Sequence, residues 1–213
     1  NPKVGKTALI NEIAGSKLKN GNWPGVTAEK KEAQFTYENE EIFLIDLPGV
    51  YSLSPYSNEE IITRDYIINE NPDLIINVVD ATNLERNLYL TALLKELGKP
   101  MIIALNLYDE FKKLDYRLDE KQFEEFFGLN IVKTSARTRE GLEDLLKKAI
   151  AMSKEKEKTN FKLHFNSTID KEVEAIKKEI SDKEEFEPVL EKLSLDYLAV
   201  KLLEEDKHLI DVL

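Results

Sequence analysis

Short apolar runs alternate with longer helical patterns through the first 152 residues of the chain. The runs that predict strands are Gln34–Tyr37, Glu41–Ile45, Leu74–Val79, Met101–Leu105 and Asn130–Lys133. Apolar residues at helical spacing predict helices at Lys6–Ala14, Glu59–Asn69, Leu84–Leu97, Glu120–Phe127 and Glu140–Met152. This alternation is typical of a parallel sheet flanked by helices. We therefore expect an α/β domain over residues 1–152.

The pattern changes after residue 152. A mixed-charge run at 153–158 is followed by two sets of apolar residues at helical spacing, with Pro188 placed to start a turn of helix between them. The sets are Ile169, Val173, Ile176 and Ile180, and then Leu195, Leu198, Ala199, Leu202 and Leu203. A small all-α domain is therefore expected over residues 153–213.

Composition and charge narrow the functional classes. The net charge is −11, and residues 153–213 hold 11 basic and 16 acidic side chains, so the chain repels nucleic-acid backbones. No cysteine is present, which excludes disulfides and thiolate metal sites. The apolar run Met101–Leu105 is far shorter than the roughly 20 residues that a membrane span needs. Bulk nucleic-acid binding is thus disfavoured, whereas a nucleotide needs only a local pocket.

The first residues resemble a phosphate-binding loop. Asn1-Pro2-Lys3-Val4-Gly5-Lys6-Thr7 matches G-x-x-x-x-G-K-[ST] if the first glycine and the strand that feeds the loop precede Asn1. In such a loop the backbone N–H groups up to Ala8 surround phosphates, Lys6 reaches the β- and γ-phosphates, and the Thr7 hydroxyl binds Mg²⁺. The alternative is a helix N-terminus with a chance lysine.

Three further motifs follow predicted strands. Asp46-Leu-Pro48-Gly49 offers a carboxylate to Mg²⁺ and an N–H to the γ-phosphate, or else forms an ordinary turn. Asn106-Leu107-Tyr-Asp109 offers a carboxylate that accepts hydrogen bonds from guanine N1–H and its 2-amino group, or else is a cap. Ser135-Ala136 places backbone near guanine O6, unless Ser135 only caps a helix.

The order of the four motifs decides between these alternatives. Each lies at a strand-to-loop junction, and ligands of open α/β sheets bind at the carboxyl ends of the strands. Four coincidences in this order are improbable. The joint pattern therefore indicates a guanine-nucleotide-binding domain.

Further motifs resemble one family. Asn22-Trp-Pro-Gly-Val-Thr27, Glu29-Lys-Lys-Glu32, Val50-Tyr-Ser-Leu53, Arg64-Asp-Tyr66 and Glu85-Arg-Asn-Leu-Tyr89 are similar to the cytosolic GTPase region of ferrous iron transport protein B. The resemblance implies a Ras-like P-loop GTPase domain with a mixed, mostly parallel sheet. Residues around Tyr197–Leu203 resemble, more loosely, that family's helical linking domain, a guanine-nucleotide dissociation inhibitor.

The resemblance also assigns roles within residues 17–31. Thr27, preceded by Gly25 and Val26, is implied as the switch threonine that ligates Mg²⁺ and senses the γ-phosphate; the alternative is a strand threonine. Trp23 is then expected on a mobile loop rather than in the core. Because contacts of such a switch depend on γ-phosphate and Mg²⁺, residues 17–31 are expected to be the least ordered part of the nucleotide-free protein.

Two residues bear on catalysis. Val50 stands where many small GTPases place a water-orienting glutamine, so intrinsic hydrolysis is expected to be slow. The family often compensates with K⁺ held partly by a loop asparagine, but Lys3 occupies that position here and an ammonium repels K⁺. Lys3 either supplies positive charge near the β- and γ-phosphates or points to solvent. The catalytic candidates are Lys3, Lys6, Thr27 and Gly49.

The sequence thus predicts a GTP- and Mg²⁺-binding, slowly hydrolysing domain that regulates ferrous iron uptake. The resemblance implies a membrane-embedded transporter domain as partner, a position at the cytoplasmic face of the membrane, and a possible homo-oligomer. Two alternatives stay open: a ribosome- or RNA-associated GTPase, disfavoured by the acidic tail, and a switch module that binds GTP without hydrolysing it.

Overall fold

The computed structural model describes residues 1–24, 29–54, 56–155 and 166–210. In the α/β part, the helices are α1 (Lys6–Ala14), α2 (Asn58–Glu70), α3 (Leu84–Glu96), α4 (Tyr108–Phe111), α5 (Glu120–Phe127) and α6 (Leu142–Glu155). Its strands are β1 (Leu18–Asn22), β2 (Glu29–Tyr37), β3 (Glu40–Asp46), β4 (Ile75–Asp80), β5 (Met101–Asn106) and β6 (Asn130–Lys133). The helical part holds α7 (Ser167–Ser181), α8 (Glu187–Leu190), α9 (Leu195–Leu203) and α10 (Lys207–Ile210).

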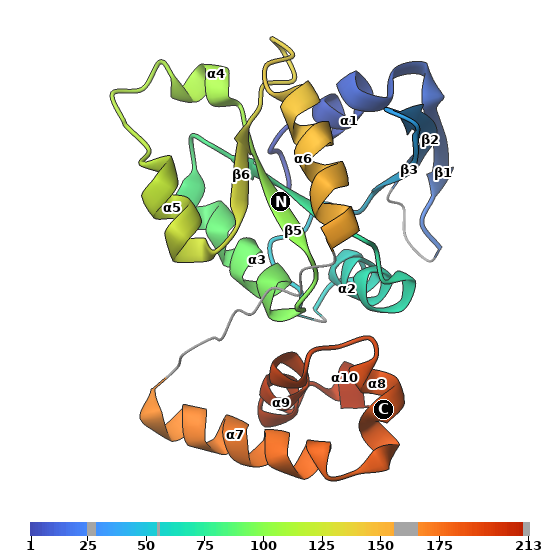
Figure 1. Cartoon of the computed structure of the whole chain (residues 1–213), viewed down its shortest axis with the longest axis vertical. Helices are drawn as coiled ribbons and strands as arrows, with labels where there is room; N and C mark the ends of the chain where they lie inside the picture. The colour runs from blue at the N-terminus through green and yellow to red at the C-terminus, as the bar shows by residue number, and fades with distance from the viewer. Residues whose placement is uncertain (25–28, 55, 156–165, 211–213) are drawn as a thin grey trace.

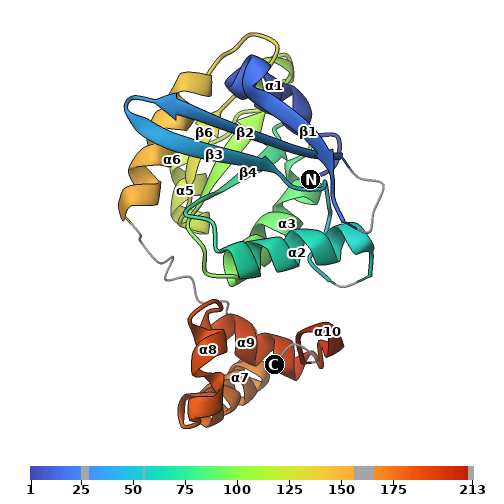
Figure 2. The same ribbon diagram turned by 90° about the vertical axis from the view of Figure 1, so that its right-hand side faces the viewer.

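The strands form two three-stranded sheets, as the two views show (Figures 1 and 2). β1, β2 and β3 pair antiparallel in that order, whereas β4, β5 and β6 pair parallel in that order. The predicted mixture of strand directions is confirmed. Its antiparallel portion is larger than the sequence pattern indicated, because β1 was not predicted and β2 begins five residues before the predicted strand.

β5 lies at the centre of the parallel sheet and is buried along its whole length. Alternate side chains of a strand point to opposite faces. Accordingly, Ile102 and Ala104 pack in a core shared with α1 and α6, whereas Met101, Ile103 and Leu105 pack in a core shared with α2 and α3. The continuous apolar run of this strand is therefore explained by helices covering both of its faces.

The segment around Trp23 differs from the prediction. Residues 18–22 form β1, and Leu18 to Asn22 pair with Ala33 to Glu29 of β2. Trp23 is buried, its ring meets Tyr66 of α2 edge-on at 5.4 Å, and the Lys30 ammonium lies 5.4 Å from its ring centre. The expectation that Trp23 lies outside the core is thus wrong, because Trp23 packs against α2 and the residues before it pair with β2. The expectation that residues 17–31 are the least ordered part of the nucleotide-free protein stays a prediction, and residues 25–28 lie outside the described ranges.

The helical part follows the predicted apolar spacing. Val173 and Ile180 of α7 and Leu198 and Ala199 of α9 are buried, and Pro188 lies in the first turn of α8. Asn166 caps α7 and Ser194 caps α9, each through a side-chain oxygen that accepts a backbone N–H. The mixed-charge run 153–158 ends α6, and its residues beyond Glu155 lie outside the described ranges.

The helical part docks against α2 and α3, beyond the sheets (Figures 1 and 2). Arg64 of α2 donates to Asp206 at 2.6 Å, and their side chains are 1% and 6% exposed. The Ser194 hydroxyl donates to the carbonyl of Glu96 at the end of α3, at 3.1 Å. One apolar core runs through both parts of the chain. The two predicted domains are therefore joined by a buried ion pair and continuous packing.

Among the described residues, no helix combines the length and the apolar character that crossing a membrane requires.

Candidate nucleotide-binding site

The four sequence motifs meet where strands end. β3 ends at Asp46, β5 ends at Asn106, and the Thr134-Ser135-Ala136 segment follows directly after β6. Asn106 is fully buried and joins the other two loops: its Nδ2 donates to the carbonyl of Val4 at 2.9 Å, and its Oδ1 accepts from Thr134 Oγ1 at 3.2 Å. The loops after β5 and β6 thus lie at one edge of the parallel sheet and are joined to the phosphate loop, whereas Asp46 ends a strand of the separate antiparallel sheet.

The backbone of the phosphate loop requires glycine at one position. Gly5 caps α1 with a positive φ of 77°, and a Cβ there would lie 2.6 Å from Nδ2 of Asn106. A side chain would therefore push away the asparagine that holds the loop. Lys3 also has positive φ, at 60°, and is exposed, as are Thr7 and Ala8. Asn1 and Val4 are buried, and Pro2 is partly buried.

Lys6 already has partners without nucleotide. Its ammonium contacts the carboxylate of Asp46 and donates to the carbonyl of Leu47 at 2.5 Å. Asp46 is buried, so the ammonium compensates a negative charge that would otherwise be unpaired. Lys6 and Asp46 therefore hold the start of α1 against the end of β3.

The loop after Asp46 packs tightly against the phosphate loop. A Cβ on Gly49 would lie 3.2 Å from Cα of Pro2, so glycine permits this close approach. The carbonyl of Pro48 accepts from Thr63 Oγ1 of α2 at 3.3 Å, which ties the loop to that helix. Val50 is buried in the core that α2 and α3 share. Its side chain is therefore apolar and turned into the core.

The oxygen donors near Lys6 fit a magnesium ion. The Thr7 hydroxyl and the Asp46 carboxylate are the hard oxygen ligands that Mg²⁺ prefers, and Mg²⁺ commonly takes its remaining ligands from water and substrate phosphates. Within the described ranges no cluster of three or more acidic or histidine side chains could hold a metal by itself. The third predicted ligand, Thr27, lies outside the described residues with Gly25 and Val26.

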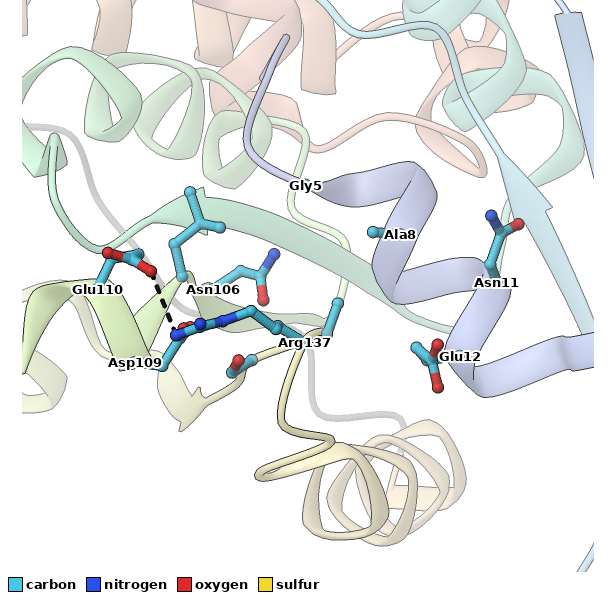
Figure 3. A pocket seen from close by; sticks show the side chains of 11 residues that line it. Gly5, Ala8, Asn11, Glu12, Asn106, Asp109, Glu110 and Arg137 are labelled. Atoms are coloured by element: carbon cyan, nitrogen blue, oxygen red, sulfur yellow. Dashed lines mark hydrogen bonds and ion pairs between the residues drawn. The ribbon is translucent and has the colours of Figure 1, made fainter.

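Asn106 also lines a cavity of about 380 Å³. Figure 3 shows Gly5 and, from α1, Ala8, Asn11 and Glu12 along one wall, with Asn106, Asp109, Glu110 and Arg137 along the facing wall. Leu107, Ser135 and Ala136 complete the lining. Every residue predicted for the guanine site thus lines this cavity.

Asp109, in the wall of this cavity, has neighbours that stabilise its ionised form. Hydrogen bonds from the side chains of Ser135 and, secondarily, Arg137 lower the pKa of Asp109 below its usual value, so this carboxyl is ionised at neutral pH. Arg137 Nε donates to Oδ2 of Asp109 at 2.8 Å. The carboxylate is therefore held in the cavity wall in its charged form, paired with Arg137.

The sequence patterns missed four residues of the cavity wall. These are Asn11, Glu12, Glu110 and Arg137. Asn11 and Glu12 lie on α1, four residues or more after the motif that begins the helix, and no motif names them. Arg137 directly follows Ser135-Ala136, and that adjacency is the signal that could have identified it.

Comparisons with known proteins agree with this arrangement. The family model described as ferrous iron transport protein B matches residues 1–149. The chain is 43% identical over 212 residues to an Fe(2+) transport protein A/Fe(2+) transporter FeoB fusion protein of Porphyromonas gingivalis, covering 98% of this chain and 25% of that protein. It is 45% identical over 213 residues to the Fe(2+) transporter FeoB of Methanocaldococcus jannaschii, covering 100% of this chain and 31% of the relative.

Solved structures resemble the whole chain. The cytosolic domain of the FeoB iron transporter of T. maritima, in a GDP form and in a GMPPNP form, superposes with a TM-score of 0.88 at 38% identity. The matches cover 97% and 96% of this chain and 79% of that one. Our chain thus has the Ras-like G-domain fold, while it spans only 25% to 31% of the length of the curated relatives described above. The chain belongs to the ferrous iron transport protein B family.

Proposed function

We propose that the chain binds GTP with Mg²⁺, hydrolyses it slowly, and regulates a ferrous iron transporter from the cytoplasmic face of the membrane. The observation that carries this proposal is the cavity in which Asp109 and Ser135 face Gly5 of the phosphate loop. Solved structures with the same fold are of a FeoB cytosolic domain in GDP and GMPPNP forms, and the full-length relatives are named Fe(2+) transporters. A membrane-embedded transporter domain is the proposed partner.

The bound purine would lie between α1 and Asp109. The ionised carboxylate accepts hydrogen bonds, which matches the N1–H and 2-amino donors of guanine, whereas adenine offers no donor at its N1 position. The phosphates would lie at the N-terminus of α1, where backbone N–H groups and the helix dipole favour anions. Lys6 would exchange Asp46 for the β- and γ-phosphates.

Mg²⁺, when bound, would neutralise charge on the phosphates. Thr7 and Asp46 are the described residues that would hold it, together with Thr27 if that residue acts as the switch threonine. The Gly49 N–H would donate toward the γ-phosphate, so that loss of this phosphate would remove a hydrogen bond from the loop that leads to α2. Slow turnover follows from Val50, which is buried and has no group that orients water.

Lys3 is proposed to act as a fixed cation near the β- and γ-phosphates. Lys3 lies in the loop three residues before Lys6, and its side chain is exposed. Both observations support this role. Hydrolysis by the unmodified chain should then be equal in K⁺ and Na⁺ buffers of the same ionic strength. Strong stimulation by K⁺ would show that Lys3 does not fill this role.

The helical part is proposed to slow nucleotide release. α2 begins shortly after Gly49 and carries Arg64, which binds Asp206 of the helical part. A change in the loop after Asp46 therefore reaches the helical part through one helix. Release of fluorescent GDP should accelerate in an Asp206→Asn variant, and an unchanged release rate would count against this coupling.

The base site has a direct test. Binding of fluorescent GDP is measured against GTP, ATP and XTP as competitors, for the unmodified chain and for Asp109→Asn. Loss of the carboxylate should weaken guanine binding by about 1–3 kcal/mol, the cost of an unpaired buried polar group, and shift preference toward xanthine. Glu110→Gln is the matched control, because it removes a neighbouring charge from the same cavity. Unchanged selectivity in Asp109→Asn refutes the assignment.

Hydrolysis is tested separately. Under single turnover with excess protein, GTP should convert slowly to GDP and phosphate. Binding without conversion would favour a switch module that signals by occupancy alone.

A further inference from the structure

The carboxylate proposed to bind guanine is already engaged by a cation of the same chain. Arg137 Nε donates to Oδ2 of Asp109 at 2.8 Å, and its Nη2 contacts that same oxygen. Nη2 also lies 3.3 Å from Oε1 of Glu110. Figure 3 shows the guanidinium lying across the cavity wall beside both carboxylates. Thus Arg137 occupies one oxygen of Asp109 and neutralises its charge.

Arg137 and a bound guanine would compete for Oδ2 of Asp109. A guanine held by a carboxylate uses both of its oxygens, because N1–H and the 2-amino group are parallel donors. Both nitrogens of Arg137 point at Oδ2, so they take the acceptor positions of that oxygen that a base would need. Arg137 must therefore release Oδ2 before the base can form both hydrogen bonds.

The side chain of Arg137 is free to do so. It is 65% exposed, whereas that of Asp109 is 11% exposed, so the arginine can swing into solvent while the carboxylate stays fixed. An exposed ion pair of this kind is weak, so it opens readily. The apparent affinity of a ligand falls in proportion to the fraction of protein in the binding-competent state.

We infer that Arg137 is a competing internal ligand for the guanine-binding carboxylate, so that it slows and weakens nucleotide entry. This inference rests on the proposed function of the cavity. It concerns the nucleotide-free state alone, and it therefore assigns the effect to the association rate and not to the dissociation rate.

Arg137→Gln removes the charge and keeps a similar length. Stopped-flow binding of GDP labelled on its ribose should show association about two- to six-fold faster than in the unmodified chain, with dissociation unchanged. The difference should shrink in 1 M salt, because salt screens exposed ion pairs. Arg137→Lys, which keeps the charge without the planar fork, should fall between the two.

Arg139→Gln is the matched control. Arg139 lies on the same loop, is 68% exposed, and pairs with Glu12 of α1 instead of Asp109. Both variants lose one positive charge from the same loop, so any loss of long-range attraction for GDP is common to them. Association of Arg139→Gln should therefore not rise.

The outcomes separate the two levels of inference. If Arg137→Gln associates no faster than Arg139→Gln, or if its dissociation accelerates because Arg137 contacts the bound base, the inference is overturned while GDP binding stands. If the unmodified chain fails to bind GDP, both the inference and the proposed function fall.

Discussion

The ion pair between Arg64 and Asp206 should contribute strongly to the folding of the whole chain. Both side chains are nearly buried, and two further nitrogens of Arg64, Nε and Nη2, have no hydrogen-bond partner among the described residues. Asp206 is therefore the main compensation for a buried guanidinium. Asp206→Asn keeps a side-chain oxygen that can accept from the N–H of Leu209, as Asp206 Oδ1 does at 3.1 Å, but it turns an NH2 donor toward Arg64, so this substitution removes both the charge and the acceptor of the guanidinium.

Breaking a buried ion pair by removing one partner destabilises a protein by about 3–5 kcal/mol. We expect Asp206→Asn to lower the free energy of unfolding by an amount in this range, measured by urea denaturation followed by far-UV circular dichroism. Asp65→Asn is the control. Asp65 lies on the same helix, and its carboxylate lies 3.1 Å from Nε2 of His208 and 4.0 Å from Nε of Arg64; because its side chain is 38% exposed, its loss should cost less than about 1 kcal/mol.

A double variant with Arg64→Met separates the pair from its surroundings. If the two residues act on each other, Asp206→Asn in the Arg64→Met background should destabilise far less than it does alone. Equal, small effects of Asp206→Asn and Asp65→Asn would refute the reasoning, since buried and exposed pairs would then count alike. Additive effects in the double variant would also refute it.

Three further predictions concern single positions. Gly141→Ala should unfold the Ser135 loop and abolish GDP binding, because Gly141 has φ of 73° and a Cβ there would lie 1.8 Å from the carbonyl oxygen of Lys133. Gly15→Ala is the control, because Gly15 has φ of 54° but no atom within 4 Å of an added Cβ. This control should lower the free energy of unfolding by only about 1–2 kcal/mol. Burial raises the pKa of Glu96 to about 7, so ionisation of this carboxyl opposes folding as pH rises from about 4.5 through 7. Glu96→Gln should therefore raise the free energy of unfolding at pH 8 by about 1–2 kcal/mol and leave it unchanged at pH 4. Equal effects at both pH values would contradict this. Ser57→Ala should cost about 1 kcal/mol in urea unfolding, because Ser57 and Glu60 form a capping box on α2, and a neutral result would show that the cap contributes nothing.

Apolar spacing was sufficient to predict most elements of both domains. The helices α1, α2, α3, α5, α7 and α9 lie close to their predicted ranges, because each must bury one stripe of apolar side chains. β1 could not be predicted in this way. Leu18-Lys-Asn-Gly-Asn22 holds one apolar residue, so this strand exists through its pairing with β2 rather than through its own side chains.

The candidate site was predictable only as far as motifs reach. Gly5, Lys6, Asp46, Asn106 and Asp109 stand in a fixed order, and the fold brings them together from the start of α1, the end of the antiparallel strand β3 and the end of the parallel strand β5. The partners that these side chains take without nucleotide depend on distances across the fold. The contact of Lys6 with Asp46 joins residues 40 apart in the chain, and no local pattern records it.

The hydrogen bonds of Asn106 have a consequence for binding thermodynamics. By holding Val4 and Thr134 at once, this side chain fixes the relative positions of the phosphate loop and the loop after β6 when the protein folds. The entropy of ordering these two backbones is then lost before any ligand arrives, and preorganised sites bind with a smaller entropic penalty. An Asn106 variant would therefore bind purine nucleotides poorly through disorder of its loops, even if the asparagine never touched the base.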